Sequence, residues 1–286
     1  MNKTKKIRSA VAVIIAFLMS ICIVASCVIG VAKLTALNPS YAKRIIEKSG
    51  FGEKKSEELK TELVSYGNAC NIGGDFFDEF FEKTLTPLFI ENDAKTYYEA
   101  VYTQKNAKPD TAHIESMLKP ALVEYAEKMG YADEESLDED INLIVSEMGQ
   151  IYSGVMSLPS VSTVNTLISK LTGYCEMGLI AALGGTLLTG LMLLFMFKPK
   201  VYSVRYLIYA FSGAFLMLLA IPLYLRITNL VGKVNIVSKA LYSFIVSFSN
   251  GVFDGLIISA AACLIITVLL GVIYLLLLKR AEEKAE

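Results

Sequence analysis

The residues able to do chemistry in this 286-residue chain are few and scattered. His113 is the only histidine, so a histidine-containing metal site needs carboxylates or thiols as its other ligands. Residues 133–140 hold six acids in eight positions, but they lack the alternating ligands and central glycine of an EF-hand loop. Because an apolar helical stripe follows them, these acids favour capping of a helix N-terminus over metal binding.

Catalytic motifs are also missing from the sequence. No G-x-x-x-x-G-K-[ST] is present, so nucleotide hydrolysis by a P-loop is excluded. Neither G-x-S-x-G nor S-x-x-K stands in a suitable context for a serine nucleophile. We therefore expect a protein that is not an enzyme, with no catalytic, cofactor-binding or metal-binding residues and no cofactor.

The five cysteines do not form a disulfide framework. Cys22, Cys27 and Cys263 lie in apolar stretches, whereas Cys70 and Cys175 do not and could pair in an oxidising compartment. Residues 24–27 also read Val-Ala-Ser-Cys, as in a bacterial lipobox that would lipidate Cys27 after cleavage. Apolar residues continue to position 32, which favours an uncleaved first span, and both the lipid and the disulfide remain open.

The elements that position these residues are dominated by four stretches without any charged side chain. Residues 9–32, 177–197, 206–225 and 255–278 are 24, 21, 20 and 24 residues long. A helix needs roughly 20 apolar residues to cross a bilayer, and only a helix or a closed barrel satisfies the backbone in lipid. A mean hydropathy of +0.50 agrees with this composition. The sequence thus predicts four transmembrane helices.

Positive charges predict the orientation of these spans. Ten cations flank them in three short segments, namely Lys3, Lys5, Lys6, Arg8, Lys198, Lys200, Arg205, Lys279, Arg280 and Lys284. The positive-inside rule assigns such segments to the cytoplasm. We therefore expect both termini on the cytoplasmic side of the cell membrane and residues 33–175 on the outer side. The outer side is not free of cations, because Arg226, Lys233 and Lys239 lie in the second outer loop.

The segment between the first two spans reads as an acidic helical domain. Residues 33–173 carry 23 Asp and Glu against 14 Lys and Arg, a net charge of −9, which disfavours nucleic acid as a partner. Asn38-Pro39 predicts a helix start and Gly50 a stop. Apolar positions at three- and four-residue steps predict further helices around Leu59–Tyr66, Phe76–Leu85, Ile114–Met129 and Leu137–Val155, with a kink or break at Pro120.

Two further patterns predict an amphipathic helix and close packing of the spans. A stripe of Ile236, Ala240, Phe244 and Phe248 predicts an amphipathic helix, at the membrane surface or capping the outer domain. Small residues at four-residue spacing predict close packing of the spans. They are Ala12, Ala16 and Ser20; Gly178, Ala182, Thr186 and Gly190; Ala210 and Ala214; and Gly255, Ser259 and Cys263.

The predicted fold class is all-α, a four-helix transmembrane bundle with a helical extracytoplasmic domain between the first and second spans. The expected segments are a cytoplasmic N-terminus 1–8, spans 9–32, 176–197, 206–225 and 254–278, the outer domain 33–175, a cytoplasmic loop 198–205, an outer loop with the amphipathic helix 226–253, and a cytoplasmic tail 279–286.

The start of the outer domain, Asn38-Pro39-Ser40-Tyr41 through Lys48-Ser49-Gly50-Phe51, resembles uncharacterised four-span membrane proteins of low-GC Gram-positive bacteria. This resemblance implies a topology and no activity. Our first hypothesis is a non-enzymatic surface interaction or sensing module, whose partners are the lipid bilayer and another membrane or surface protein.

The alternative is a permease-like or accessory subunit of a membrane transport complex. One span, a large outer segment and three further spans are similar to permease subunits of the cell-division and macrolide-exporter type. Such subunits meet an ATPase at the cytoplasmic surface, and the longest internal loop here is only residues 198–205.

Overall fold

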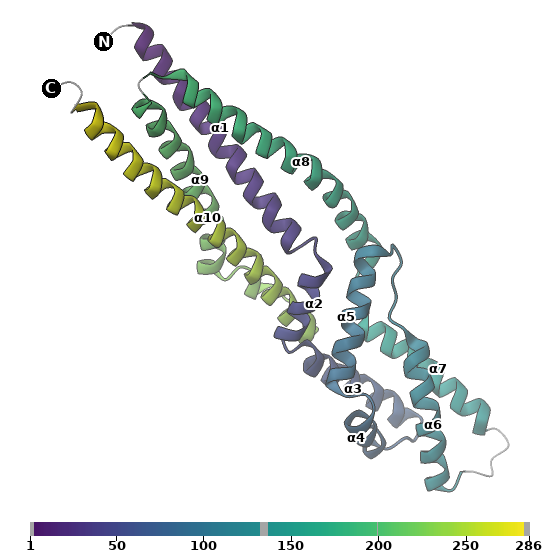
Figure 1. The fold of residues 1–286 in the computed structure, drawn as a ribbon. Coiled ribbons are helices and arrows are strands. Elements are labelled where there is room, and N and C mark those ends of the chain that lie inside the picture. The colour runs from purple at the N-terminus through teal and green to yellow at the C-terminus, as the bar shows by residue number, and fades with distance from the viewer. Residues whose placement is uncertain (1–2, 132–136, 199, 283–286) are drawn as a thin grey trace. The chain divides into compact units, whose positions relative to one another are not determined.

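The computed structural model describes residues 3–131, 137–198 and 200–282. Throughout these ranges the chain forms helices and turns without a strand, which confirms the all-α prediction (Figure 1). The α-helices are α1 Lys3–Leu34, α2 Pro39–Lys48, α3 Phe51–Ala69, α4 Gly74–Lys83, α5 Pro87–Thr103, α6 Thr111–Met129, α7 Leu137–Met156, α8 Val161–Met196, α9 Val201–Thr228 and α10 Lys239–Glu282, with a 3-10 turn η1 at Val231–Lys233.

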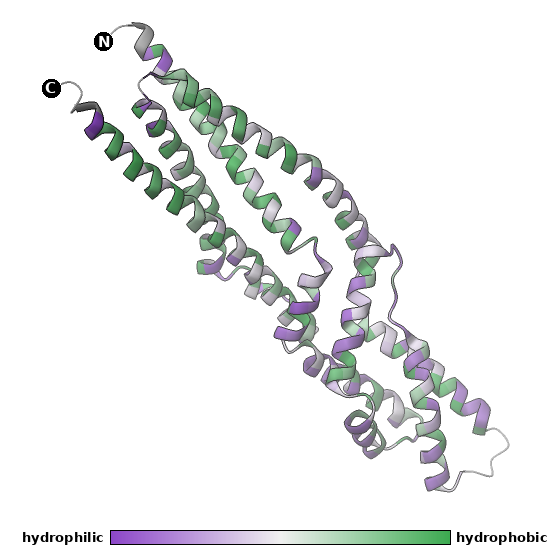
Figure 2. Cartoon of the chain, viewed as in Figure 1, coloured by the Kyte–Doolittle hydropathy of each residue, from purple (hydrophilic) through white to green (hydrophobic). Residues whose placement is uncertain are grey.

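The chain divides into two compact units. The apolar unit comprises Met1–Leu37, Lys170–Lys233 and Ser249–Glu286, and the helical domain comprises Asn38–Ser169 and Val234–Phe248. Hydrophobic residues run along most of α1 and α9, whereas α2 to α7 alternate hydrophobic and hydrophilic positions (Figure 2). This alternation is what a helix with one buried and one solvated face requires.

The apolar unit carries the candidate membrane spans. Among the described residues, four helical segments are long and apolar enough to cross a bilayer: Lys6–Leu34, Val161–Met196, Val201–Lys233 and Lys239–Arg280. They cover the four charge-free stretches of the sequence except for Phe197, so the predicted number of spans is confirmed.

Helix α1 contacts each of the other three helices of this unit at a glycine. A Cβ atom built on Gly213 of α9 would lie 2.8 Å from Ser20 Oγ, and one on Gly185 of α8 would lie 2.9 Å from Cys22 Sγ. On α10, a Cβ on Gly255 would lie 2.9 Å from Val31 Cγ1. Ser20 and Gly255 of the predicted small-residue stripes thus lie at close helix contacts, and Gly185 and Gly213 add two glycines outside those stripes.

Packing within this unit is uneven. α1 and α9 bury a shared stripe of small residues, namely Ala12, Ala16, Ala210 and Ala214. α8 and α10 instead leave most of their large apolar side chains exposed, for example Ile180 and Ile258. In a membrane such surfaces face lipid at no hydrophobic cost.

The helical domain has its own core, built mainly from aromatic and branched side chains. Phe77, Leu59, Leu63, Ile90 and Leu118 are fully buried in it. Helices α2, α5 and α6 begin at a side-chain cap: Asn38 accepts from the Ser40 amide, Thr86 from Phe89 and Asp110 from Ala112. The Asn38-Pro39 start is confirmed, as is the stop at Gly50, whose φ of +64° suits glycine.

Residues Val234–Phe248 belong to this core although they follow the third candidate span. Ala240 and Phe244 are buried in it, and the Phe244 ring lies 5.1 Å from that of Tyr98. The stripe at positions 236–248 therefore packs on the helical domain, which is one of the two positions that its pattern predicts.

Three details differ from the sequence pattern. α8 begins at Val161 and α10 at Lys239, so Glu176 and Asp254 lie inside long helices rather than at helix ends. Because no proline lies between residues 160 and 198 or 223 and 286, nothing forces a break there. Of the kink or break predicted at Pro120, the break does not occur, since α6 is continuous through this exposed residue.

Candidate functional site

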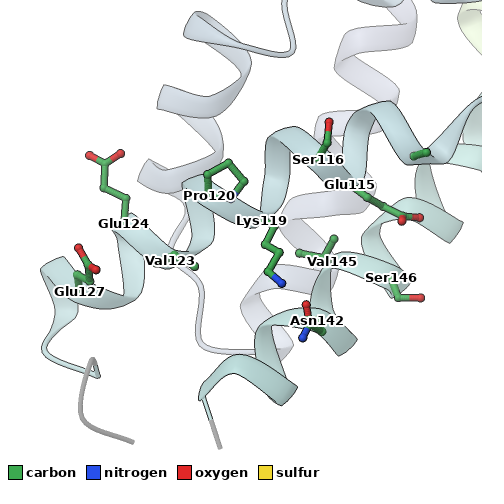
Figure 3. A pocket seen from close by; sticks show the side chains of 11 residues that line it. Glu115, Ser116, Lys119, Pro120, Val123, Glu124, Glu127, Asn142, Val145 and Ser146 are labelled. Carbon is green, nitrogen blue, oxygen red and sulfur yellow. The ribbon is translucent and has the colours of Figure 1, made fainter.

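An open groove between α6 and α7 is the candidate site of the helical domain (Figure 3). It has a volume of about 870 Å³, and the two helices that form it lie side by side. Its lining residues are Ala112, Glu115, Ser116, Lys119, Pro120, Val123, Glu124 and Glu127 of α6, and Asn142, Val145 and Ser146 of α7.

The amphipathic pattern of both helices decides which residues line this groove. α6 buries Ile114, Leu118 and Leu122 in the core, which leaves the neighbouring faces of the helix accessible. α7 buries Ile141 and Met148 in the same way. The groove is the furrow between these two helices, and Val145 of the buried stripe of α7 lies at its floor.

The groove has an apolar floor and a rim that carries three glutamates and one lysine, Lys119. Val145 lies at the floor and is buried, and Val123, which also lines the groove, is half-buried. Glu124 and Glu127 lie toward one end of the groove and Glu115 toward the other (Figure 3). Such a surface suits binding of an amphipathic segment and offers no nucleophile paired with a base.

Gly149 of α7 lets the acidic rim come close to the partner helix. A Cβ atom at this position would lie 2.6 Å from Glu115 Oε1, so Glu115 of α6 lies directly over the backbone of α7. At this end of the groove, Glu115 therefore lies against both helices. At the other end, Glu124 forms an ion pair with Lys128 of its own helix, at 2.8 Å.

A buried polar pair joins α5 to α7 within the same domain. The Tyr152 hydroxyl donates to the Asp93 carboxylate, and Tyr152 is buried. Burial raises the pKa of Asp93 above its usual range although the bond from Tyr152 opposes this, and burial together with the Asp93 charge raises the pKa of the Tyr152 hydroxyl. The pair satisfies a core tyrosine and has a structural role.

A second polar network attaches the start of α10 to α3. The Glu58 carboxylate accepts from Lys55 Nζ at 2.9 Å, Ser238 Oγ at 2.8 Å and the Ala240 amide at 3.0 Å. Burial would raise the pKa of Glu58, but these bonds outweigh it and hold the pKa below its usual value. The Leu241 amide donates to Ser238 Oγ at 3.1 Å, so Ser238 caps α10.

The residues that the sequence brings to attention do not converge on one site. His113 is exposed with its ring 5.0 Å from that of Phe89, and Cys70 and Cys175 are both free. Of the acidic run at 133–140, residues 133–136 lie outside the described ranges. In the part of the chain that is described, no group of three or more His, Cys, Asp or Glu could hold a metal ion.

Arg226 and Asp254 form an ion pair within the apolar unit. Arg226 Nη2 lies 2.6 Å from Asp254 Oδ1 and links α9 to α10. The segments expected from the sequence place Arg226 just after the third span and Asp254 at the start of the fourth, and they do not predict this pairing. Since both side chains are substantially exposed, the pair contributes little to stability.

Sequence reasoning misses helix α5 and the network around Glu58. Thr86-Pro87 has the same form as Asn38-Pro39, so a helix start was readable there. Lys55, Glu58 and Ser238 carry no comparable signal, because the two segments they join are remote in sequence.

Comparison with known proteins adds no functional assignment. No protein-family model, no curated protein and no solved structure matches this chain. The four candidate spans, by length and composition, indicate a membrane protein, and any further function rests on the geometry.

Proposed function

We propose that this chain is a non-enzymatic interaction module of the cell membrane, whose helical domain binds a helix of another membrane or surface protein outside the cytoplasm. The observation that carries the proposal is the open groove between α6 and α7. The apolar unit anchors the domain in the bilayer.

The orientation in this proposal rests on charge. The cations at Lys6 and Arg8, at Lys198 and Arg205, and at Arg280 flank the candidate spans on the side predicted to be cytoplasmic. With both termini on that side, the helical domain faces outward. Its net charge of −9 over residues 33–173 keeps it away from anionic lipid and nucleic acid.

The chemistry of the partner follows from the groove. Two helices lying side by side accept a third helix in the furrow between them, with apolar side chains against the floor. Glu115, Glu124 and Glu127 outnumber Lys119 on the rim, and their excess negative charge complements Lys or Arg on the flanks of that helix. The partner segment is therefore a cationic amphipathic helix.

The permease-type alternative has a weaker basis. α8 ends at Met196 and α9 begins at Val201, so only residues 197–200 remain as a connector that could meet an ATPase. The groove of the helical domain has no role in that alternative.

Photo-crosslinking in living cells tests the groove. A photoreactive amino acid at Ser146, on the rim, should give an adduct with one defined peptide segment rich in Lys or Arg. The double variant Glu124→Lys/Glu127→Lys should reduce this adduct at least about tenfold, since like charges oppose binding. Glu82→Lys, an exposed reversal on α4, is the matched control and should leave the adduct unchanged.

Two outcomes contradict the proposal. One is an equal adduct from a photoreactive residue at Glu62, an exposed position of α3. The other is an adduct at Ser146 that persists after the charge reversal. Orientation is tested separately with single cysteines at the exposed positions Gln104 and Tyr202 in a cysteine-free background, because an impermeant maleimide should label only position 104 in intact cells.

A further inference from the structure

Two cysteines of the apolar unit lie in direct contact although they are remote in sequence. Cys27 of α1 and Cys263 of α10 lie close enough for their thiols to interact, and Cys27 packs against the buried apolar cluster that contains Cys263. Cys263 is buried, with 3% of its surface exposed, and Cys27 is half-buried beside the same small cluster of apolar side chains. The two sulfur atoms are therefore neighbours on facing helices.

The approach of these two helices has an independent cause. Gly255 of α10 lies against Val31 of α1, where a Cβ atom would come within 2.9 Å of Val31 Cγ1. Val31 is one helical turn beyond Cys27 in α1, and Gly255 is two turns before Cys263 in α10. Glycine thus brings the backbones together close to the thiol pair.

The other cysteine of α1 faces a different helix. Cys22 lies against Gly185 of α8, where a Cβ atom would be 2.9 Å from its sulfur atom. Cys22 shares the helix and the apolar surroundings of Cys27 and lies more than one turn away. It is a matched control for the pair because it is directed to α8 and not to α10.

We propose that Cys27 and Cys263 form a two-thiol redox site that reacts with a small uncharged peroxide and closes to a disulfide. The Cys27 thiol attacks one peroxide oxygen, which breaks the O–O bond and yields a sulfenic acid and one molecule of water. The Cys263 thiol then attacks the Cys27 sulfur, forms the S–S bond and releases a second water. Both thiols are oxidised, and one hydrogen peroxide is reduced to two waters.

Accessibility decides the order of the two steps. Cys263 is buried among apolar side chains, so its thiol is shielded from reagents. Cys27 is the more accessible thiol, so the peroxide meets it first, and redox-sensing cysteines are often placed beside a resolving cysteine. The product ties α1 covalently to α10, the first candidate span to the fourth.

Thiol counting on the full-length protein in lipid vesicles tests the site. The protein is treated with hydrogen peroxide, quenched, denatured and labelled with a maleimide polymer that adds a fixed mass to each free thiol. The number of labelled thiols should fall from the five cysteines of the chain to three. Reduction should restore all five.

Serine variants identify the residues involved. Cys22→Ser should still lose two thiols, whereas Cys27→Ser and Cys263→Ser should lose none through disulfide formation. In Cys263→Ser, a dimedone-type reagent should trap the sulfenic acid at Cys27. The proposal is overturned if the untreated count persists after peroxide, if Cys27→Ser still loses two thiols, or if dimedone labels Cys22 instead. Serine is close to cysteine in size, so each variant should keep its fold. Unchanged helical content in each variant checks this.

Discussion

Removing the carboxylate of Glu58 should destabilise the helical domain far more than removing an acid from its surface. The carboxylate accepts three hydrogen bonds, two of them from residues at the start of α10. The side chain of Lys55 is only 7% exposed and that of Glu58 is 22% exposed. Glu58→Ala therefore leaves a buried ammonium ion whose remaining partner is Ser238 Oγ at 3.4 Å.

The magnitude follows from this burial. Breaking a buried ion pair by removing one partner costs about 3–5 kcal/mol, because the other charge stays desolvated. Glu58→Gln keeps an acceptor for the Ala240 amide and loses the charge, so about 2 kcal/mol is expected. The double variant Lys55→Met/Glu58→Leu should recover most of the stability, since it removes the uncompensated charge.

The assay is unfolding of the full chain in detergent together with hydrogen exchange. Exchange should accelerate in Val234–Phe248, which Glu58 attaches to α3. Glu79→Ala, which breaks the exposed Glu79–Lys83 pair, is the control and should leave the stability nearly unchanged. A Glu58→Ala variant no less stable than the control, or a double variant as unstable as the single one, would refute the reasoning.

Two further predictions concern packing and pH. Gly52→Ala should destabilise the chain by about 1–3 kcal/mol despite the better helix propensity of alanine, because the added Cβ would lie 2.5 Å from the Pro87 carbonyl oxygen. Gly154→Ala is the control and should be neutral or stabilising, since Gly154 has open space around it. Equal melting temperatures for the two variants would contradict this prediction. The pKa of Asp93 is raised in the folded state, which therefore binds more protons than the unfolded state, so the wild type should lose stability as pH rises above about 3.8. Asp93→Asn should remove this loss. An equal change in the free energy of unfolding between pH 4 and pH 7 for both proteins would count against the prediction.

Much of the architecture follows from local patterns. Asn38-Pro39 and Gly50 bound α2 as expected, and the buried stripes of α6 and α7 include the predicted Ile114, Leu118 and Ile141. These patterns succeed because caps and helical periodicity act between residues a few positions apart. Met129 is the exception, since it belongs to the stripe of α6 but is exposed at the last turn of the helix.

The candidate sites depend on neighbours that no local pattern reveals. The groove needs α6 and α7 side by side, and the thiol pair needs Cys27 on α1 to face Cys263 on α10. Of the three cysteines in apolar stretches, the sequence does not distinguish Cys22 from Cys27. Only the packing against Gly185 directs the former to α8.

The sequence by itself determines which helices form, which residues could take part in chemistry, and whether each helix suits water or lipid. Charge-free runs of 20 to 24 residues are long enough to span a bilayer as helices, and the lone His113 leaves few routes to a metal site. The tertiary structure alone decided that Val234–Phe248 joins the domain of Asn38–Ser169 and that two remote thiols meet. The reason is that period and composition act along one helix, whereas docking depends on the shapes of two surfaces brought together in space.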